Sequence, residues 1–152
     1  MATLTQIRQA LANQIQTYCV NPQLRAQAEP LDQGVGPVAL ILPGSPYIKY
    51  GDTFADTFND LGQMQFGVCV NLCVLILVSD SSTADREQQQ LDAFLDLGTA
   101  ADQISVPMAI QMDPTLGGIV MSTVPIQVGH YGRLPYGGVE YFGARLEVQI
   151  MA

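Results

Sequence analysis

The run QMQFGVCVNLCVLILV, residues Gln63–Val78, is the most apolar stretch of the chain and decides the fold. Its even-numbered residues, from Met64 to Val78, are all apolar, while the odd-numbered ones include polar side chains. Because successive side chains of a strand point to opposite faces, this alternation predicts a β-strand with one dry face that packs under helices. The side chains expected on the face available to a neighbour are Gln65, Cys69, Asn71 and Cys73.

The length of this run limits what it can be. A transmembrane helix needs about 20 predominantly apolar residues, and this run is shorter and contains two glutamines and an asparagine. As a strand at about 3.3 Å per residue it would span on the order of 50 Å, far more than an ordinary strand of about 5–6 residues. We therefore expect it to bend or bulge near Gly67 or Asn71, or to extend past the body of its domain.

The composition points away from nucleic acid and towards protein partners. The chain has 152 residues, of which 6 are basic and 14 acidic, for a net charge of -8. Its length suits a single domain, residues 1–152, with a core of its own. Binding to phosphates needs clustered Lys and Arg, whereas the only Lys is Lys49 and the five Arg are scattered. Since only 13% of residues are charged and 48% are hydrophobic, part of the surface is expected to be reserved for partners.

The N-terminal segment and the cysteines indicate a cytoplasmic folding environment. The start, MATLTQIRQALANQIQ, is amphipathic and lacks the apolar block of a secretory signal. The three cysteines cannot all pair. On an extended strand Cys69 and Cys73 would lie about 13 Å apart, beyond the roughly 7 Å limit between Cα atoms for a disulfide. We expect these cysteines to be small buried residues.

Three helices are predicted from signals at their ends. Thr3 is a plausible N-cap for a helix that stops before Asn21-Pro22. The sequence Ser82-Thr83-Ala84-Asp85 resembles a capping box that begins a second helix, which Gly98 closes. Ser105 caps a short helical turn that runs through Met112, and the following Asp113–Gly118 has turn chemistry.

Further strands are predicted on both sides of the long one. Val38–Leu42 and Tyr47–Tyr50 read as two short strands joined by a turn at Pro43–Pro46, after a loop from Pro22 to Pro37. Gly51–Gly62 fits a short helix or a long ordered loop equally well. The predicted strands at the C-terminal end are Ile119–Tyr131, which bulges or lies at an edge because of Pro125, and the alternating Val139–Met151.

This order of elements predicts an α+β fold. We expect a mostly antiparallel β-sheet with long strands, packed against the N-terminal helix and the second, central helix, with the helices on one side.

The chain offers few groups for catalysis or metal binding. His130 is the only histidine, so no site with paired His ligands can form within one chain. A Ser/His/Asp triad can be composed on paper from Ser122, His130 and an aspartate, but the chain has no Gly-x-Ser-x-Gly elbow. Gly34–Ala39 matches Gly-x-Gly-x-x-Ala by accident, because it precedes a strand and contains Pro37. We expect no enzyme activity, no catalytic, cofactor-binding or metal-binding residue and no cofactor.

Several segments together carry a family resemblance over nearly the whole chain. They are YIKY at 47–50, the long strand, LDAFLD at 91–96, SVPMAI at 105–110, DPTLGG at 113–118 and YGGVEYFGA at 136–144. In this order they resemble the tail terminator proteins of long-tailed, non-contractile bacteriophages.

The resemblance implies a structural virion protein that forms a hexameric ring on the last ring of the tail tube. Such a ring stops tube growth and presents the surface that joins the filled head. The implied partners are further copies of the chain, the tail tube protein, head-neck connector proteins and DNA that passes without specific binding, with no membrane. The implied location is the virion tail or neck, after assembly in the host cytoplasm. No catalytic residues carry over.

A ring of this kind needs an interface that closes by rotation, and strands that project from a domain can supply one. The candidate assembly-interface residues are Gln65, Asn71, Asp113, Leu116, Gly117 and Gly118. Leu116-Gly117-Gly118 is either a tight turn that lets backbones approach or a plain loop before a strand. Two rival functions stay open: a head closure or head-to-tail connector protein, and a small α+β ligand-binding or enzymatic domain.

Overall fold

The computed structural model describes residues 3–19, 24–28, 37–50, 68–79, 84–96 and 104–152. The elements are α1 (Leu4–Tyr18), β1 (Arg25–Gln27), β2 (Val38–Tyr50), β3 (Val68–Ser79), α2 (Ala84–Leu95), α3 (Val106–Met112), β4 (Ser122–Tyr136) and β5 (Val139–Met151). The sequence features that lie outside the described residues are Gln65, Gly67, the Gly51–Gly62 segment, the Ser82 cap and Gly98.

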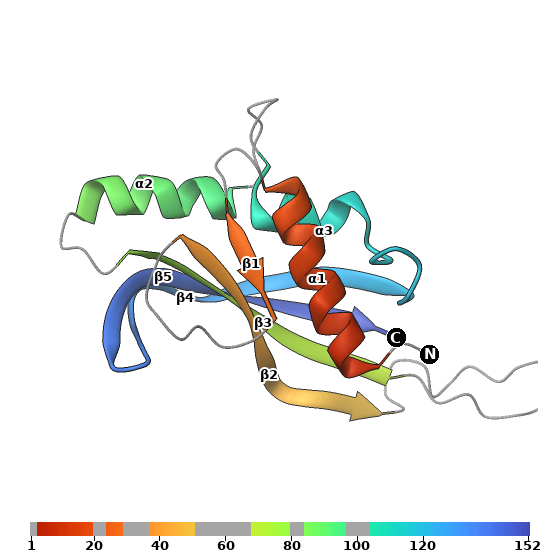
Figure 1. Cartoon of the computed structure of the whole chain (residues 1–152). Helices are drawn as coiled ribbons and strands as arrows, with labels where there is room; N and C mark the ends of the chain where they lie inside the picture. The colour runs from red at the N-terminus through yellow and green to blue at the C-terminus, as the bar shows by residue number, and fades with distance from the viewer. Residues whose placement is uncertain (1–2, 20–23, 29–36, 51–67, 80–83, 97–103) are drawn as a thin grey trace, which may run out of the picture.

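The five strands form one sheet in the order β1-β2-β3-β5-β4. Only the pair of β1 and β2 is parallel; the other three pairs are antiparallel. The three helices lie on one side of this sheet (Figure 1). The predicted α+β fold, with helices on one side of a mostly antiparallel sheet of long strands, is therefore confirmed.

Two of the helices begin at the residues whose side chains were expected to cap them. The Thr3 hydroxyl accepts from the backbone N–H of Gln6 at 3.2 Å, and the Gln6 side chain accepts from the N–H of Thr3 at 2.9 Å. At α3 the Ser105 hydroxyl accepts from the N–H of Met108 at 3.4 Å. These bonds satisfy backbone donors that the first turn of a helix leaves without partners.

The long strand places its even-numbered side chains in the main core, as predicted. The side chains of β3 in this core are Val70, Leu72, Val74, Ile76 and Val78. They pack with Ile7, Leu11 and Ile15 of α1 and with Leu91 and Phe94 of α2. Burying a side chain of this size stabilises a fold by about 1.5–3 kcal/mol, so this layer contributes strongly to stability.

The opposite face of β3 is less open than predicted. Cys69 and Cys73 are buried, because side chains of β5 lie over them. The Gln149 amide donates to the Cys69 sulfur at 2.9 Å, and the Arg145 Nε donates to the Cys73 sulfur at 3.4 Å. The expectation that these two cysteines face a neighbour is wrong, while the expectation that they are buried is confirmed.

The predicted turn at Pro43–Pro46 is a bulge within one strand. Residues 38–43 pair with 77–72 and residues 48–50 pair with 70–68, so β2 keeps its direction along β3. The residues left without a partner, 44–47, lie opposite Asn71. The irregularity expected near Asn71 therefore belongs to β2, since β3 pairs with β5 without interruption from Cys69 to Leu77.

The predicted loop between Pro22 and Pro37 contains a strand that the sequence did not indicate. Arg25–Gln27 pairs in parallel with residues 38–40 of β2. Three residues are too few to show a periodic pattern, so only the partner strand makes this segment recognisable.

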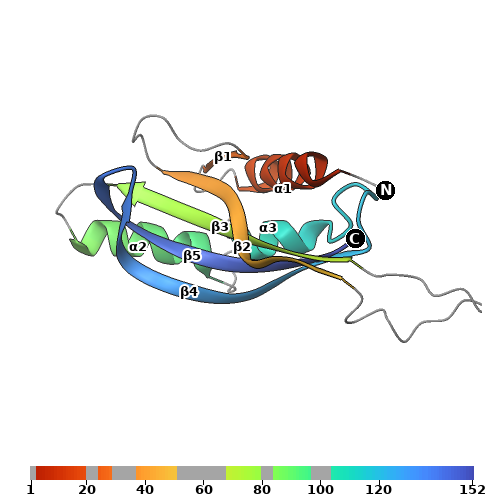
Figure 2. The same ribbon diagram turned by 90° about the horizontal axis from the view of Figure 1, so that it is seen from below.

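The long hairpin of β4 and β5 forms one edge of the sheet. β4 is an edge strand with register shifts after Pro125 and after Val128, so both outcomes expected of Pro125 occur. The end of the hairpin curls to the side of the sheet away from the helices (Figure 1), and in the view from below it lies beside the end of β3 (Figure 2). There Leu134 and Tyr141 join a second buried cluster with β2 and β3, whose remaining buried members are Val38, Leu40, Leu75 and Leu77.

Candidate assembly surface

The described candidate residues lie in two separate places. Asn71 lies on the face of the sheet that points away from the helices, which we call the open face. The turn Asp113–Gly118 connects α3, in the helix layer, to β4. The structure therefore does not bring Asn71 and the turn into one site.

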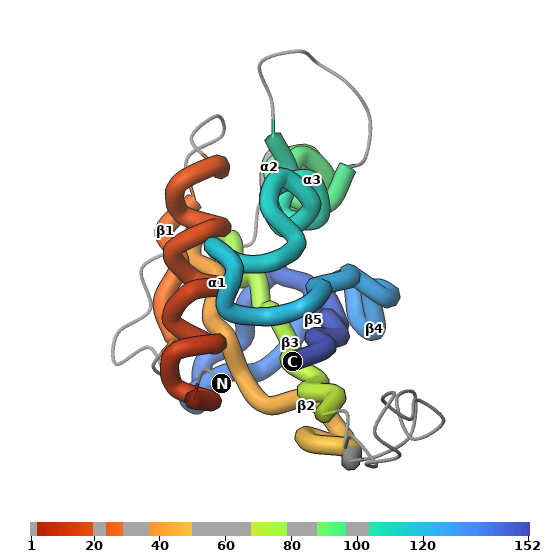
Figure 3. The backbone as a smooth tube through the Cα atoms, turned by 90° about the vertical axis from the view of Figure 1, so that its right-hand side faces the viewer, coloured from red at the N-terminus to blue at the C-terminus, as the bar shows by residue number. Residues whose placement is uncertain are grey.

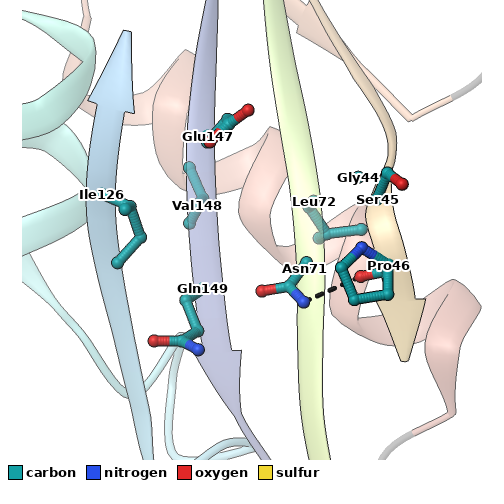
Figure 4. Close-up of a pocket in the computed structure, with 9 residues that line it drawn as sticks. All are labelled: Gly44, Ser45, Pro46, Asn71, Leu72, Ile126, Glu147, Val148 and Gln149. Carbon is teal, nitrogen blue, oxygen red and sulfur yellow. Dashed lines mark hydrogen bonds between the residues drawn. The ribbon is translucent and has the colours of Figure 1, made fainter. Parts of the chain in front are cut away.

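Asn71 holds the β2 bulge in place. Its side-chain amide donates to the carbonyl oxygen of Pro46 at 2.8 Å (Figure 4). A Cβ on Gly44 would lie 2.8 Å from the backbone oxygen of Asn71, so the bulge rests directly on β3. Around this contact is a cavity of about 220 Å³, lined also by Ile126 and Glu147. Asn71 thus stabilises the β2 bulge of its own chain.

The turn after α3 is organised by Asp113. Its carboxylate accepts from the Thr115 hydroxyl at 2.6 Å, the Thr115 N–H at 3.2 Å and the Gly117 N–H at 2.8 Å. The Thr115 hydroxyl, followed by the Gly117 N–H, lowers the pKa of Asp113 below its ordinary value. Bonds to the ionised carboxylate favour it over the protonated acid.

The backbone of this turn needs glycine at two positions. Leu116, Gly117 and Gly118 have φ of 50°, 77° and 88°, and such positive values are comfortable mainly for glycine. Leu116 is only 5% exposed and belongs to the main core, whereas Gly117 and Gly118 are exposed. Within this turn, the residues exposed to another molecule are Pro114, Gly117 and Gly118, whereas the Leu116 side chain is not available.

The open face also has a larger hollow beside the hairpin. Its volume is about 600 Å³, and its polar lining residues are His130, Tyr136, Arg145 and Glu147. The His130 ring nitrogen Nε2 lies 2.9 Å from the carbonyl oxygen of Arg133, three residues further along the same strand. The Glu147 carboxylate accepts from the Gln127 amide at 2.7 Å.

Ser122 and His130 do not form the pair that a Ser/His/Asp triad would need. Ser122 and His130 both belong to β4, eight residues apart, which at about 3.3 Å per residue separates them by roughly 26 Å. That distance rules out the hydrogen bond that a Ser/His pair requires. Within the described part of the chain, no group of three or more His, Cys, Asp or Glu side chains could hold a metal ion.

The most distinctive surface is the rim of the sheet at β4, which the sequence interpretation missed. Apolar side chains are exposed there on both faces of the sheet, since Val124 pairs with Gln149 of the open face and Val128 pairs with the core residue Leu146. Met121, just before the strand, is 66% exposed and Ile126 is 52% exposed. We call the β4 edge the set of exposed apolar residues Met121, Val124, Ile126, Val128 and Tyr131. β4 pairs only with β5, so the backbone groups on its other side have no strand partner in the described part of the chain.

The β4 edge also lacks charge. From Pro114 to Gly132 the sequence contains no Asp, Glu, Lys or Arg. Edge strands of monomeric proteins usually carry charged side chains that prevent pairing with other chains. The apolar content of this stretch was a signal for a strand, but it gave no reason to place those side chains outside the core.

No protein-family model and no curated protein matches this chain. None of the helices in the described ranges is long and apolar enough to cross a membrane.

Proposed function

We propose that this chain is a tail terminator: a structural virion protein that forms a ring on the tail tube of a long-tailed, non-contractile phage, ends tube polymerisation and offers the joining surface for the head. The proposal starts from the sequence resemblance. The observation that carries it further is the β4 edge, a set of exposed apolar side chains at the rim of the sheet, in a stretch that carries no charged residue before Arg133.

Such an edge suits a protein whose working state is an assembly. Left in water, a long apolar edge strand promotes uncontrolled pairing between chains. Covering it with another subunit removes the apolar area from water, at about 25 cal/mol per Å². A net charge of -8 opposes random association, so contact is directed to the uncharged stretch.

The acidic balance also suits a channel for DNA. Phosphates bind to clustered Lys and Arg with strong dependence on salt. A ring made of chains with six basic and fourteen acidic residues would let DNA slide without holding it. The proposed protein partners, the tail tube protein and the head-neck connector proteins, come from the resemblance, and the charge balance supports DNA as a passing occupant.

Light scattering and negative-stain images of the purified chain test the proposal. We expect rings, formed by the chain alone or on tail tubes, and tubes capped by the chain should stop growing when tube protein is added. A chain that stays monomeric under all conditions and forms no ring on tail tubes would overturn it. Binding to portal-bearing heads, without binding to tail tubes, would instead identify a head-to-tail connector.

A further inference from the structure

The two edges of the sheet lie on opposite sides of the molecule and differ in chemistry. In Figure 3, α1 and β1 lie on one side and β4 on the other. This agrees with the strand order, which puts β1 and β4 at the two ends of the sheet.

The side of α1 and β1 has a shallow groove of about 280 Å³. We call it the α1–β1 groove; it is lined by Gln9, Ala12, Asn13, Ala26, Gln27 and Ala28. The three alanines are buried, and the lining residues are all uncharged. The small alanines at its base leave room for side chains of another molecule, and the amides of Gln9, Asn13 and Gln27 line the groove above them.

The charges that flank the two edges differ in balance: α1 and β1 carry only basic charges, whereas on the β4 side two acidic residues accompany the exposed Arg133. The charged residues of α1 and β1 are Arg8 and Arg25, both basic. On the other side, the exposed Asp92 of α2 is tied to the β4 edge, because its carboxylate accepts from the Tyr131 hydroxyl at 2.6 Å. Asp96 follows at the end of the same helix and is also exposed. Opposite charges around neutral contact areas favour one orientation of approach and disfavour like with like.

We propose that the β4 edge of one copy of this chain docks into the α1–β1 groove of the next copy, head to tail. The inference rests on the proposed ring. A contact between two β4 edges would close after two copies, whereas a ring needs two different surfaces that meet in the same way around the circle. The two edges supply that pair: apolar side chains beside acidic groups on one, and an uncharged groove beside basic groups on the other.

Two variants, each blocking one surface, test the proposal. Ile126→Lys places a charge on the β4 edge, where the wild-type side chain is half exposed, so the new charge can stay in contact with water. Asn13→Glu places a negative charge at the groove, opposite the approaching acidic side. The matched controls are Val139→Lys at the exposed hairpin end and Gln111→Glu on α3, because both positions are exposed and belong to neither surface.

The expected result is specific to a head-to-tail contact. Each blocked variant alone should associate at least tenfold more weakly than wild type in analytical ultracentrifugation, while the controls associate as wild type does. Mixed in equal amounts, the blocked variants should form dimers and stop, since one intact β4 edge and one intact groove remain. Thermal unfolding of each variant checks the fold, and Met121→Lys replaces Ile126→Lys if the latter unfolds.

The other outcomes distinguish a failure of this inference from a failure of the proposed function. If either blocked variant still forms wild-type assemblies, or if the mixture stays monomeric, the two surfaces do not meet and the inference fails. If wild type forms rings and the blocked variants assemble equally well, the inference fails but the proposed function stands. Head-to-tail oligomers that obey the mixing rule but never cap a tail tube would leave the inference standing and overturn the proposed function.

Discussion

The side-chain amide of Gln14 donates a hydrogen bond to the backbone carbonyl of Asp113, with 2.9 Å between the nitrogen and the oxygen. The same nitrogen lies 3.0 Å from the carbonyl oxygen of Ala109 and 3.4 Å from that of Ile110. These oxygens come from the end of α3, where the helix leaves its carbonyls without intrahelical partners. Gln14, 9% exposed, therefore ties α1 to the start of the turn that leads into β4.

Replacing Gln14 should destabilise the fold through these carbonyls. We expect Gln14→Leu to lower the free energy of unfolding by about 1–3 kcal/mol, because buried acceptors lose their donor. Urea unfolding measures the difference. Gln111→Leu, at an exposed position on α3, is the control and should change the value by less than about 0.5 kcal/mol. Equal stability of Gln14→Leu and wild type would contradict this account of the α3 end.

The stability of the chain at acid pH should depend on the hydrogen bonds that the Asp113 carboxylate accepts. Its pKa in the folded chain lies below the ordinary value of 3.8, chiefly because of the Thr115 hydroxyl. A depressed folded pKa means that the stabilising contribution is present above the unfolded pKa and is lost as the pH falls through the folded pKa. The stability difference between wild type and Asp113→Asn should therefore shrink below about pH 3.8.

Thr115→Val is the matched test of the cause. Removing the hydroxyl should raise the pKa of the Asp113 carboxyl towards 3.8, as followed by NMR, while the N–H bonds remain. An unchanged pKa in Thr115→Val would show that the hydroxyl is not the main cause.

The free energy of unfolding should fall at alkaline pH because the Cys19 thiol is buried. Burial raises the pKa of this thiol from 9.0 to about 12. Its contribution to stability is therefore complete below pH 9 and is lost as the pH rises towards 12, because the unfolded thiol loses its proton first. Wild type should lose stability relative to Cys19→Ala by up to about 1.4 kcal/mol per pH unit above pH 9. Parallel pH profiles of the two proteins would argue against this shift.

Local chemistry explains which elements the sequence could predict. The caps at Thr3 and Ser105 act within three residues, so the starts of α1 and α3 are readable from the chain alone. The alternation of Val139–Met151 likewise predicts β5 with its observed bounds. The bulge at residues 44–47 was mistaken for a turn at Pro43–Pro46, because Pro-Gly-Ser-Pro has turn chemistry and only pairing with β3 shows that the strand continues.

The candidate site was harder to predict, because exposure depends on what lies above each strand. The alternation of β3 does separate the core face from the open face, but it does not show that Arg145 and Gln149 cover Cys73 and Cys69. In the same way, Ile126 and Val128 look like core residues in the sequence. They are exposed because β4 ends the sheet, and the order of strands is set by pairing far along the chain.

Gly143 should be intolerant of any side chain, because β3 and β5 approach closely there. It pairs with Leu77, and a Cβ at this position would overlap the carbonyl oxygen of Ile76. Both neighbours are backbone in the middle of a sheet and cannot move aside without breaking the ladder, so Gly143→Ala should cost about 1–3 kcal/mol of unfolding free energy. At Gly129 the nearest atom to a Cβ is the Glu147 carboxylate oxygen, at 3.2 Å, on a side chain that can rotate. Urea unfolding should therefore show a much smaller loss for Gly129→Ala, and equal losses for the two variants would refute the close approach as the cause.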